Sequence, residues 1–289
     1  MKIRLKADLT LLLAAIIWGS AFAVQRVAAQ AGSVFMFNGL RFLLGILVLL
    51  PFSGLRWNLT RRDWAVVLLA GVLLFAGSGL QQMGMQSTTA GNAGFITSVY
   101  VVLVPIALFL GWRERPHWLA WVAAFLALIG AFLLSTGGEF VFRSGDALEL
   151  AGALFWTLHV VVLGKFAPRM DGIRFAVGQM LIASVLNLAV GFTFEGSISI
   201  MQPAVFGGLI YTGIFSAGVA YTLQVLGQRH TPPSDAALIL SLEGVMAALF
   251  GWWWLNETLL PVQILGCVLI FLAVFLAQAK EFQAQLQSS

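Results

Sequence analysis

The chain has 289 residues, of which 60% are hydrophobic and only 10% are charged, whereas a soluble globular protein carries roughly 25% charged residues. This composition argues against a water-soluble fold. The formal net charge of +4 comes from basic residues that lie between apolar runs, so we expect a lipid bilayer and no nucleic acid as a partner. The single cysteine, Cys267, excludes an intramolecular disulfide and a cysteine metal centre. We expect neither a metal nor a cofactor.

Ten apolar runs follow one another along the chain, each close to the roughly 20 helical residues that cross a bilayer core. They cover approximately residues 9–29, 34–52, 64–86, 91–112, 118–135, 147–166, 173–194, 203–228, 234–255 and 261–278. The sequence therefore predicts an all-α membrane protein with ten transmembrane helices. The first run begins like a signal peptide, but it continues to Ala29 and has a counterpart in the second half, so we expect it to remain as a span.

The basic residues predict the orientation of these spans, because Lys and Arg gather at cytoplasmic ends. If the N-terminus is cytoplasmic, all but three of the 16 Lys and Arg residues lie on the cytoplasmic side. Arg26 and Arg143 then lie on the opposite side, and Arg41 lies within the second span. An even number of spans returns the chain to its starting face, so we expect both termini in the cytoplasm.

The two halves of the sequence repeat each other. Positions in the first span match the sixth at a constant offset of 138, and later positions match at an offset of 143; the matches include Asp8, Leu12 and Trp18 with Asp146, Leu150 and Trp156, and Gln81, Gly84, Thr88 and Ser98 with Gln224, Gly227, Thr231 and Ser241. We therefore expect two five-helix repeats, residues 1–138 and 139–289. Because five is odd, the second repeat enters the membrane from the opposite side, an inverted arrangement typical of transporters. A duplicated scaffold is the alternative.

Three groups of residues stand out in this repeat: Trp18-Gly19-Ser20, Ser241-Leu242-Glu243 with Asn256-Glu257, and the counterpart Ser98-Val99-Tyr100 with Glu114. These segments resemble the EamA family of the drug/metabolite transporter superfamily. The resemblance implies transport of small metabolites, amino acids among them, through a cavity between the halves. Two positions depart from the family pattern. Gly244 replaces a common proline, which predicts a less kinked ninth span, and Tyr100 stands where a second acid is possible, which argues against coupling by two carboxylates.

Two charged residues fall deep within predicted spans, Glu243 in the ninth and Arg41 in the second. A charged side chain at the bilayer centre costs roughly 2.5 to 3.5 kcal/mol or more. We therefore expect Glu243 to exchange a proton when the cavity opens, with a neutral acid that only hydrogen-bonds a neighbouring helix as the alternative. Arg41 can pair with Glu243, receive a substrate carboxylate or form a purely structural ion pair.

Aromatic and amide side chains supply the candidate substrate contacts. Trp18 and Trp156 are equivalent, and Phe22 and His159 lie about one helical turn further on. Simple packing of these rings is the competing interpretation. The remaining candidates are Tyr100, Tyr221 and the matched amides Gln81 and Gln224, since an amide within a bilayer needs a partner.

We expect a secondary transporter of the cell inner membrane that carries a small metabolite, an amino acid or a related compound, with export favoured and protons as a possible second cargo. An uptake carrier or facilitator for a vitamin, nucleoside or drug-like cation is the alternative. An intramembrane enzyme has less support, because no zinc-protease, nucleophile-elbow or phosphate-loop motif is present. We expect a monomer or a weak homodimer.

Overall fold

The computed structural model describes residues 2–32, 34–54, 57, 59–139, 141–195, 202–255 and 258–288, and every regular element in these ranges is a helix. The elements, in chain order, are α1 (Lys2–Gln30), α2 (Phe35–Ser53), α3 (Arg61–Gly84), α4 (Ala90–Ser98), α5 (Tyr100–Trp112), α6 (Trp118–Thr136), α7 (Ser144–Phe166), η1 (Ala167–Arg169), α8 (Gly172–Phe194), α9 (Pro203–Tyr211), η3 (Thr212–Ala220), α10 (Tyr221–Gln228), α11 (Pro233–Leu240), α12 (Leu242–Leu255) and α13 (Pro261–Ser288).

Within the described residues, nine helical segments are long and apolar enough to cross a membrane. The tenth expected run lies in α13, where the apolar segment Pro261–Ala277 is shorter. Large apolar side chains such as Leu47, Phe125 and Phe271 point away from the protein interior and are about half exposed. Lipid tails are the solvent that suits such a surface, so the chain is a multi-pass membrane protein.

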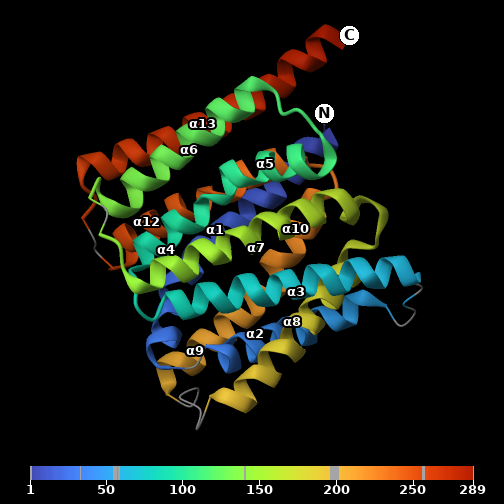
Figure 1. Ribbon diagram of the computed structural model, residues 1–289, viewed down its shortest axis with the longest axis vertical. Coiled ribbons are helices and arrows are strands. Elements are labelled where there is room, and N and C mark those ends of the chain that lie inside the picture. Colours follow the sequence, from blue (N-terminus) through green and yellow to red (C-terminus); the bar gives the residue numbers. More distant parts are fainter. Residues whose placement is uncertain are drawn as a thin grey trace.

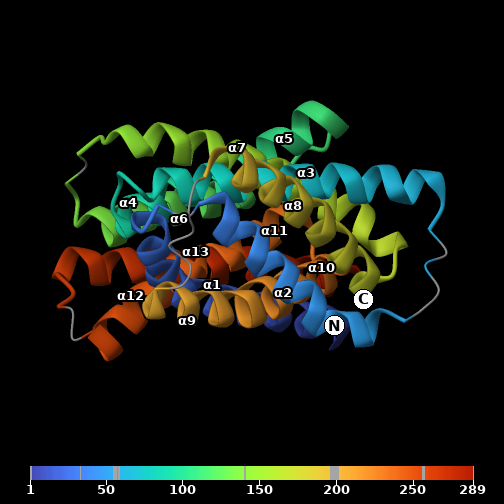
Figure 2. The same ribbon diagram turned by 90° about the horizontal axis from the view of Figure 1, so that it is seen from below.

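The first helix of each half packs against helices of the other half. Helix α6 lies along α13 at one side of the bundle, and α2 lies along α8 at the opposite side, with α1 and α7 between them (Figure 1). Helix α7 packs on α3, α4 and α5 of the first half, whereas α1 packs on η3, α10, α11 and α12 of the second half. Seen from below in Figure 2, α3 and α7 form one layer over α1, α9 and α12. The first span of each half therefore fills a groove in the other half.

Close backbone approach fixes the pairing of α6 with α13. A Cβ atom on Gly130 would lie 2.7 Å from the carbonyl oxygen of Gly266, and one on Gly266 would lie 2.5 Å from that of Gly130. Only glycine leaves room for this contact, which lets the two backbones touch in the way that small residues allow between membrane helices.

Candidate functional site

Two interrupted helices meet near the middle of the bundle. One break lies at Val99, between α4 and α5, and the other at Ser241, between α11 and α12. The Ser98 hydroxyl donates to the Gly94 carbonyl at 2.8 Å, and the Ser241 hydroxyl donates to the Leu238 carbonyl at 2.7 Å. Such side-chain bonds compete with the regular backbone ladder. Membrane transport proteins commonly place ligand sites at helix interruptions of this kind.

The expectation of a less kinked ninth span stays a prediction, but the span is interrupted at Ser241, before the glycine at position 244. The Gly244 amide donates to the Ser241 carbonyl at 3.3 Å, a bond between residues three apart that tightens the turn. In the equivalent region of the first half, Pro105 within α5 has no amide hydrogen and leaves the Val101 carbonyl without its helical donor. The ninth span thus breaks through serine and turn geometry, without a proline at 244.

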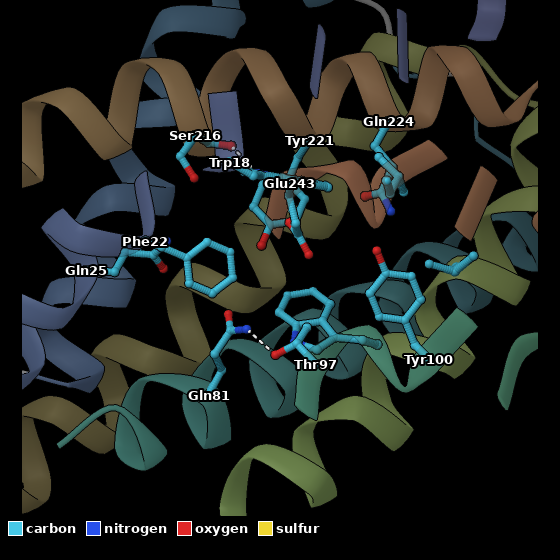
Figure 3. Close-up of a pocket in the computed structure, with 13 residues that line it drawn as sticks. Trp18, Phe22, Gln25, Gln81, Thr97, Tyr100, Ser216, Tyr221, Gln224 and Glu243 are labelled. Atoms are coloured by element: carbon cyan, nitrogen blue, oxygen red, sulfur yellow. Dashed lines mark hydrogen bonds between the residues drawn. The ribbon is translucent and has the colours of Figure 1, made fainter. Parts of the chain in front are cut away.

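A pocket lies where these breaks face α1 and α7. Its space between the atoms is about 500 Å³, including the part open to solvent. The lining residues come from both halves: Trp18, Phe22, Gln25, Gln81, Thr97, Tyr100, Trp156, Val160, Ser216, Tyr221, Gln224, Leu240 and Glu243. Figure 3 shows Glu243 and the rings of Phe22 and Tyr100 turned toward the same space. Equivalent positions of the two repeats thus line one cavity.

Aromatic rings form much of the pocket wall. The ring of Tyr221 lies between the two tryptophans, with its centroid 4.9 Å from that of Trp18 at an interplanar angle of 61° and 6.3 Å from that of Trp156 at 20°. The Trp18 indole Nε1 donates to the Ser216 carbonyl at 3.2 Å. Ser216 belongs to η3, a π-helical stretch, and such irregular turns are frequent at functional sites.

Several polar atoms that face or adjoin the pocket have no partner within the described residues. The Glu243 side chain is 6% exposed and takes part in none of the hydrogen bonds or ion pairs found there. Trp156 Nε1 and Gln224 Oε1 are buried without a hydrogen-bond partner. In contrast, the Gln81 amide donates to the Thr97 hydroxyl at 2.9 Å. Buried polar groups left without partners are costly, so a ligand or water molecule that reaches these atoms would be stabilised by them.

Arg41 and His159 lie behind the pocket wall and do not line it. The Arg41 guanidinium is 1% exposed, donates to the Gln25 amide oxygen and lies 5.1 Å from the centroid of the Phe42 ring. Among the described ion pairs none joins Arg41 to Glu243, so that pairing is not made in this structure. The fully buried His159 ring shares a 2.9 Å hydrogen bond between its Nε2 and Gln179 Oε1. Both residues support side chains that do line the pocket.

The structure brings together the other residues singled out from the sequence: Trp18, Phe22, Gln81, Tyr100, Trp156, Tyr221, Gln224 and Glu243 all line the pocket, while their role in binding stays a prediction. Sequence reasoning missed Gln25, Val160, Ser216 and Leu240 as lining residues. The spacing of seven between Trp18 and Gln25 puts them on one helix face and could have indicated Gln25. Ser216 had no such signal, because its placement depends on π-helical geometry.

Two clusters of polar residues occupy opposite ends of the bundle, since α1 and α7 begin at opposite ends (Figure 1). In the Asp8 cluster, Asp8 accepts from Thr231 at 2.7 Å, and Arg4 contacts both Asp8 and Asp235 at 2.8 Å. In the Asp146 cluster, Asp146 accepts from the Thr88 hydroxyl and from the Arg143 amide at 2.7 Å. Asp8 and Thr231 are the repeat equivalents of Asp146 and Thr88. Equivalent hydrogen bonds from threonine to aspartate therefore occur at both ends of the bundle.

Comparison with known proteins supplies the family. The pattern of the EamA-like transporter family matches residues 5–136 and again residues 143–278. An uncharacterized transporter of Archaeoglobus fulgidus is 38% identical over 279 residues, covering 96% of this chain and 87% of that protein. The uncharacterized inner membrane transporter YedA of Escherichia coli is 26% identical over 270 residues, covering 90% of this chain and 87% of YedA.

A solved crystal structure of a protein 19% identical to this chain aligns with a TM-score of 0.81 over 96% of this chain and 98% of that one, a likeness that shows the fold alone. Asn256 and Glu257, which carry part of the sequence resemblance, lie outside the described residues. The family pattern nevertheless matches both halves, and the relatives are similar over most of their length. The chain therefore belongs to the EamA-like transporter family.

Proposed function

We propose that this protein is a secondary transporter that moves a small metabolite, an amino acid with a flat side chain above all, across the cell inner membrane. In this proposal residues 1–138 and 139–289 are inverted repeats, the ten apolar runs are all spans, and both termini are cytoplasmic. Export is the favoured direction. The observation that carries the proposal is one pocket lined by both halves, with an acid and unpaired polar atoms among aromatic rings.

Alternating access follows from the packing of the two halves. The first span of each half packs on the third and fourth spans of the other half, so a relative rotation of the halves changes contacts at both ends of the pocket. The Asp8 cluster and the Asp146 cluster lie at the two ends of the bundle and share equivalent bonds. Opening one cluster while keeping the other exposes the pocket to one side at a time.

The pocket offers a complementary contact to each part of an aromatic amino acid. Glu243 can receive the ammonium group, the Trp156 Nε1–H can donate to the carboxylate, and the rings of Phe22 and Tyr221 can pack against a flat side chain. A ligand with these groups satisfies atoms that are otherwise buried without partners.

Glu243 is the acidic residue among the lining side chains, and we assign it the coupling role. A carboxyl among aromatic rings is costly to keep charged without a cation beside it. It can therefore hold a proton when the pocket is empty and release the proton when an ammonium group arrives. Export of substrate is then exchanged for entry of a proton.

An amphiphilic organic cation is the second candidate substrate. The same carboxyl lies in a pocket that also presents Trp18, Tyr100 and Tyr221, and aromatic faces attract quaternary and tertiary ammonium groups. Such a ligand would leave the Trp156 Nε1–H unsatisfied. The amino acid therefore accounts for more of the lining atoms.

Reconstituted protein tests the proposal. We would screen the purified full chain by thermal shift against amino acids, nucleosides, vitamins and amphiphilic cations, and then measure counterflow of each radiolabelled hit in proteoliposomes. We expect stabilisation by an aromatic amino acid and saturable counterflow of that compound. Flux that rises without saturation would indicate a channel, and the absence of any transported compound would contradict the proposal.

A further inference from the structure

A second buried acid, Glu149 on α7, lies outside the pocket lining. Its side chain is 1% exposed, and within the described residues neither carboxyl oxygen has a hydrogen-bond or ion-pair partner. It packs against the end of α3, where a Cβ atom on Gly84 would lie 2.8 Å from Glu149 Oε1. An unpaired carboxylate sealed in such a place would be very costly, so the site favours a carboxyl that carries a proton.

The other half of the protein shows that packing alone does not require an acid here. The repeat offset of 138 makes Leu11 the equivalent of Glu149, and the offset of 143 makes Gly227 the equivalent of Gly84. Leu11 is fully buried, and a Cβ atom on Gly227 would lie 2.6 Å from Leu11 Cγ. The same contact is thus made by leucine and glycine in one half and by glutamate and glycine in the other.

Polar groups lie near Glu149 on the side of the pocket and on the side of one bundle end. They are the Thr97 hydroxyl on α4 and the Asp146 carboxyl, one helical turn earlier on α7, and neither makes a hydrogen bond to Glu149 in this structure. Thr97 accepts from Gln81 at 2.9 Å, and both residues line the pocket together with Glu243 (Figure 3). A hydroxyl can accept one hydrogen bond while it turns to donate another. Because Thr97 also lines the pocket, its hydroxyl can take a proton from water or an acid in the pocket and pass its own proton to Glu149 after turning toward it.

Other charges on the neighbouring elements lie away from this carboxyl. Helix α4 contains no titratable residue, and those of α3 are confined to its first turn, at the far end from Gly84. The titratable residues on the remaining elements packed against α7 are Tyr100, Tyr221, Asp235 and Arg169. The two tyrosines line the pocket together with Glu243, and Asp235 pairs with Arg4. Asp146 is thus the acid that faces Glu149.

We propose that Glu149 is a second proton-binding site, which exchanges protons with the pocket through Thr97 and with the Asp146 end of the bundle. Proton binding at Glu149 stands by itself, whereas its use in transport rests on the proposed function. The expectation that two carboxylates do not cooperate was drawn from Tyr100 at the position equivalent to Glu243. Glu149 supplies a second acid from a different helix.

Carbodiimide labelling tests the proton binding directly, because dicyclohexylcarbodiimide modifies protonated carboxyls in apolar surroundings. We would treat proteoliposomes at pH 6 and pH 9 and locate the adduct by mass spectrometry. We expect labelling of Glu149 that is several-fold faster at pH 6, and none at this position in Glu149→Gln or Glu149→Leu. Equal rates at both pH values, or no adduct at either, would overturn the proposal.

The connection to the pocket needs a second measurement. Infrared spectroscopy can follow the protonated carboxyl band assigned by its loss in Glu149→Leu, a variant that matches the packing of Leu11. After transfer to deuterated water we expect this band to shift several-fold more slowly in Thr97→Val and at the wild-type rate in Thr97→Ser, which keeps the hydroxyl. An unchanged rate in Thr97→Val would refute the route through Thr97. Neither measurement requires a substrate, so failure of the transport assay and failure of this proposal are separate results.

Discussion

Several polar side chains of the pocket lack hydrogen-bond partners. Glu243, Trp156 Nε1 and Gln224 Oε1 face or adjoin a space walled by rings, and none has a hydrogen-bond partner among the described residues. A folded protein rarely leaves such groups unpaired unless something else binds them. Each of these residues can therefore be tested by removing one polar group and keeping the shape of the side chain.

Replacement of Glu243 by glutamine tests the coupling. Glutamine resembles the protonated acid in shape and hydrogen bonding but cannot release a proton. We expect Glu243→Gln to fold normally, to lose accumulation driven by a pH gradient and to retain much of the substrate exchange that moves no net proton. The exposed loop residue Glu139 provides the control variant Glu139→Gln. Full pH-driven accumulation by Glu243→Gln would remove this residue from the coupling mechanism.

Replacement of Trp156 by phenylalanine tests its unpaired indole N–H. The ring wall is kept, but the donor is lost, and a hydrogen bond to a charged group is worth about 1.5–3 kcal/mol. We expect affinity for a carboxylate-bearing ligand to fall at least tenfold, measured by isothermal titration of the purified protein. Trp118→Phe, at a position 64% exposed, is the matched control. Equal losses in both variants would show that the N–H makes no contact with the ligand.

The sequence located the main pocket residues because symmetry between the halves restricts the choice. Trp18 and Trp156 are equivalent, as are Gln81 and Gln224, and both pairs line the pocket. Glu149 was overlooked, since its counterpart Leu11 is apolar and gives no paired signal. Its spacing of seven residues from Trp156, on the same helix face, was the available indication.

At the scale of single helices, a glutamate at the end of one span caps the start of another. Glu195 follows α8, and its two carboxyl oxygens accept from the amides of Val34, Phe35 and Met36, each at 2.8 Å. These amides lie at the beginning of α2, where a helix has no acceptors of its own. The negative charge also suits the positive end of the helix. One side chain therefore joins the second spans of both halves.

Loss of this cap should destabilise the bundle without touching the pocket. In Glu195→Gln one acceptor oxygen becomes an amide donor that faces backbone N–H groups. We expect a cost of about 1–3 kcal/mol, seen as a lower unfolding temperature in detergent, with ligand affinity unchanged at temperatures where the protein is folded. Glu139→Gln again serves for comparison. A wild-type unfolding temperature would mean that water replaces the carboxylate without loss.

The apolar runs indicated where the helices lie, but not where they break. Periodicity and length predict a helix over residues 91–112 and 234–255, and both regions are helical apart from the interruptions at Val99 and Ser241. At each break a serine hydroxyl bonds to a carbonyl three or four residues earlier, but Thr10 and Thr157 make the same kind of bond within continuous helices, so the residue type alone does not predict a break. The π-helical stretch η3 was beyond prediction for the same reason, because tertiary packing selects it.

At the scale of the whole molecule, the proposed inverted arrangement predicts that two equivalent loop positions lie on opposite sides of the membrane. Ser87 and His230 differ by the repeat offset of 143 and are both exposed. We expect Ser87→Cys, in a Cys267→Ser background, to react with an impermeant thiol reagent from outside intact cells, and His230→Cys to react only after permeabilisation. The basis is the distribution of Lys and Arg. Labelling of both positions from one side would rule out the inverted topology.

The two ends of the bundle are stabilised by different numbers of polar contacts. The equivalent threonine bonds are common to both, but among the described residues Arg4 adds ion pairs to the Asp8 cluster and no ion pair joins the Asp146 cluster. In the proposed alternating-access mechanism, an empty transporter therefore spends more time closed on the Asp8 side, and added salt weakens that preference. Detailed balance forbids such a bias from choosing the direction of net flow, which the gradients alone decide. The bias instead changes the substrate concentration that half-saturates transport, and it changes this concentration differently on the two sides of the membrane.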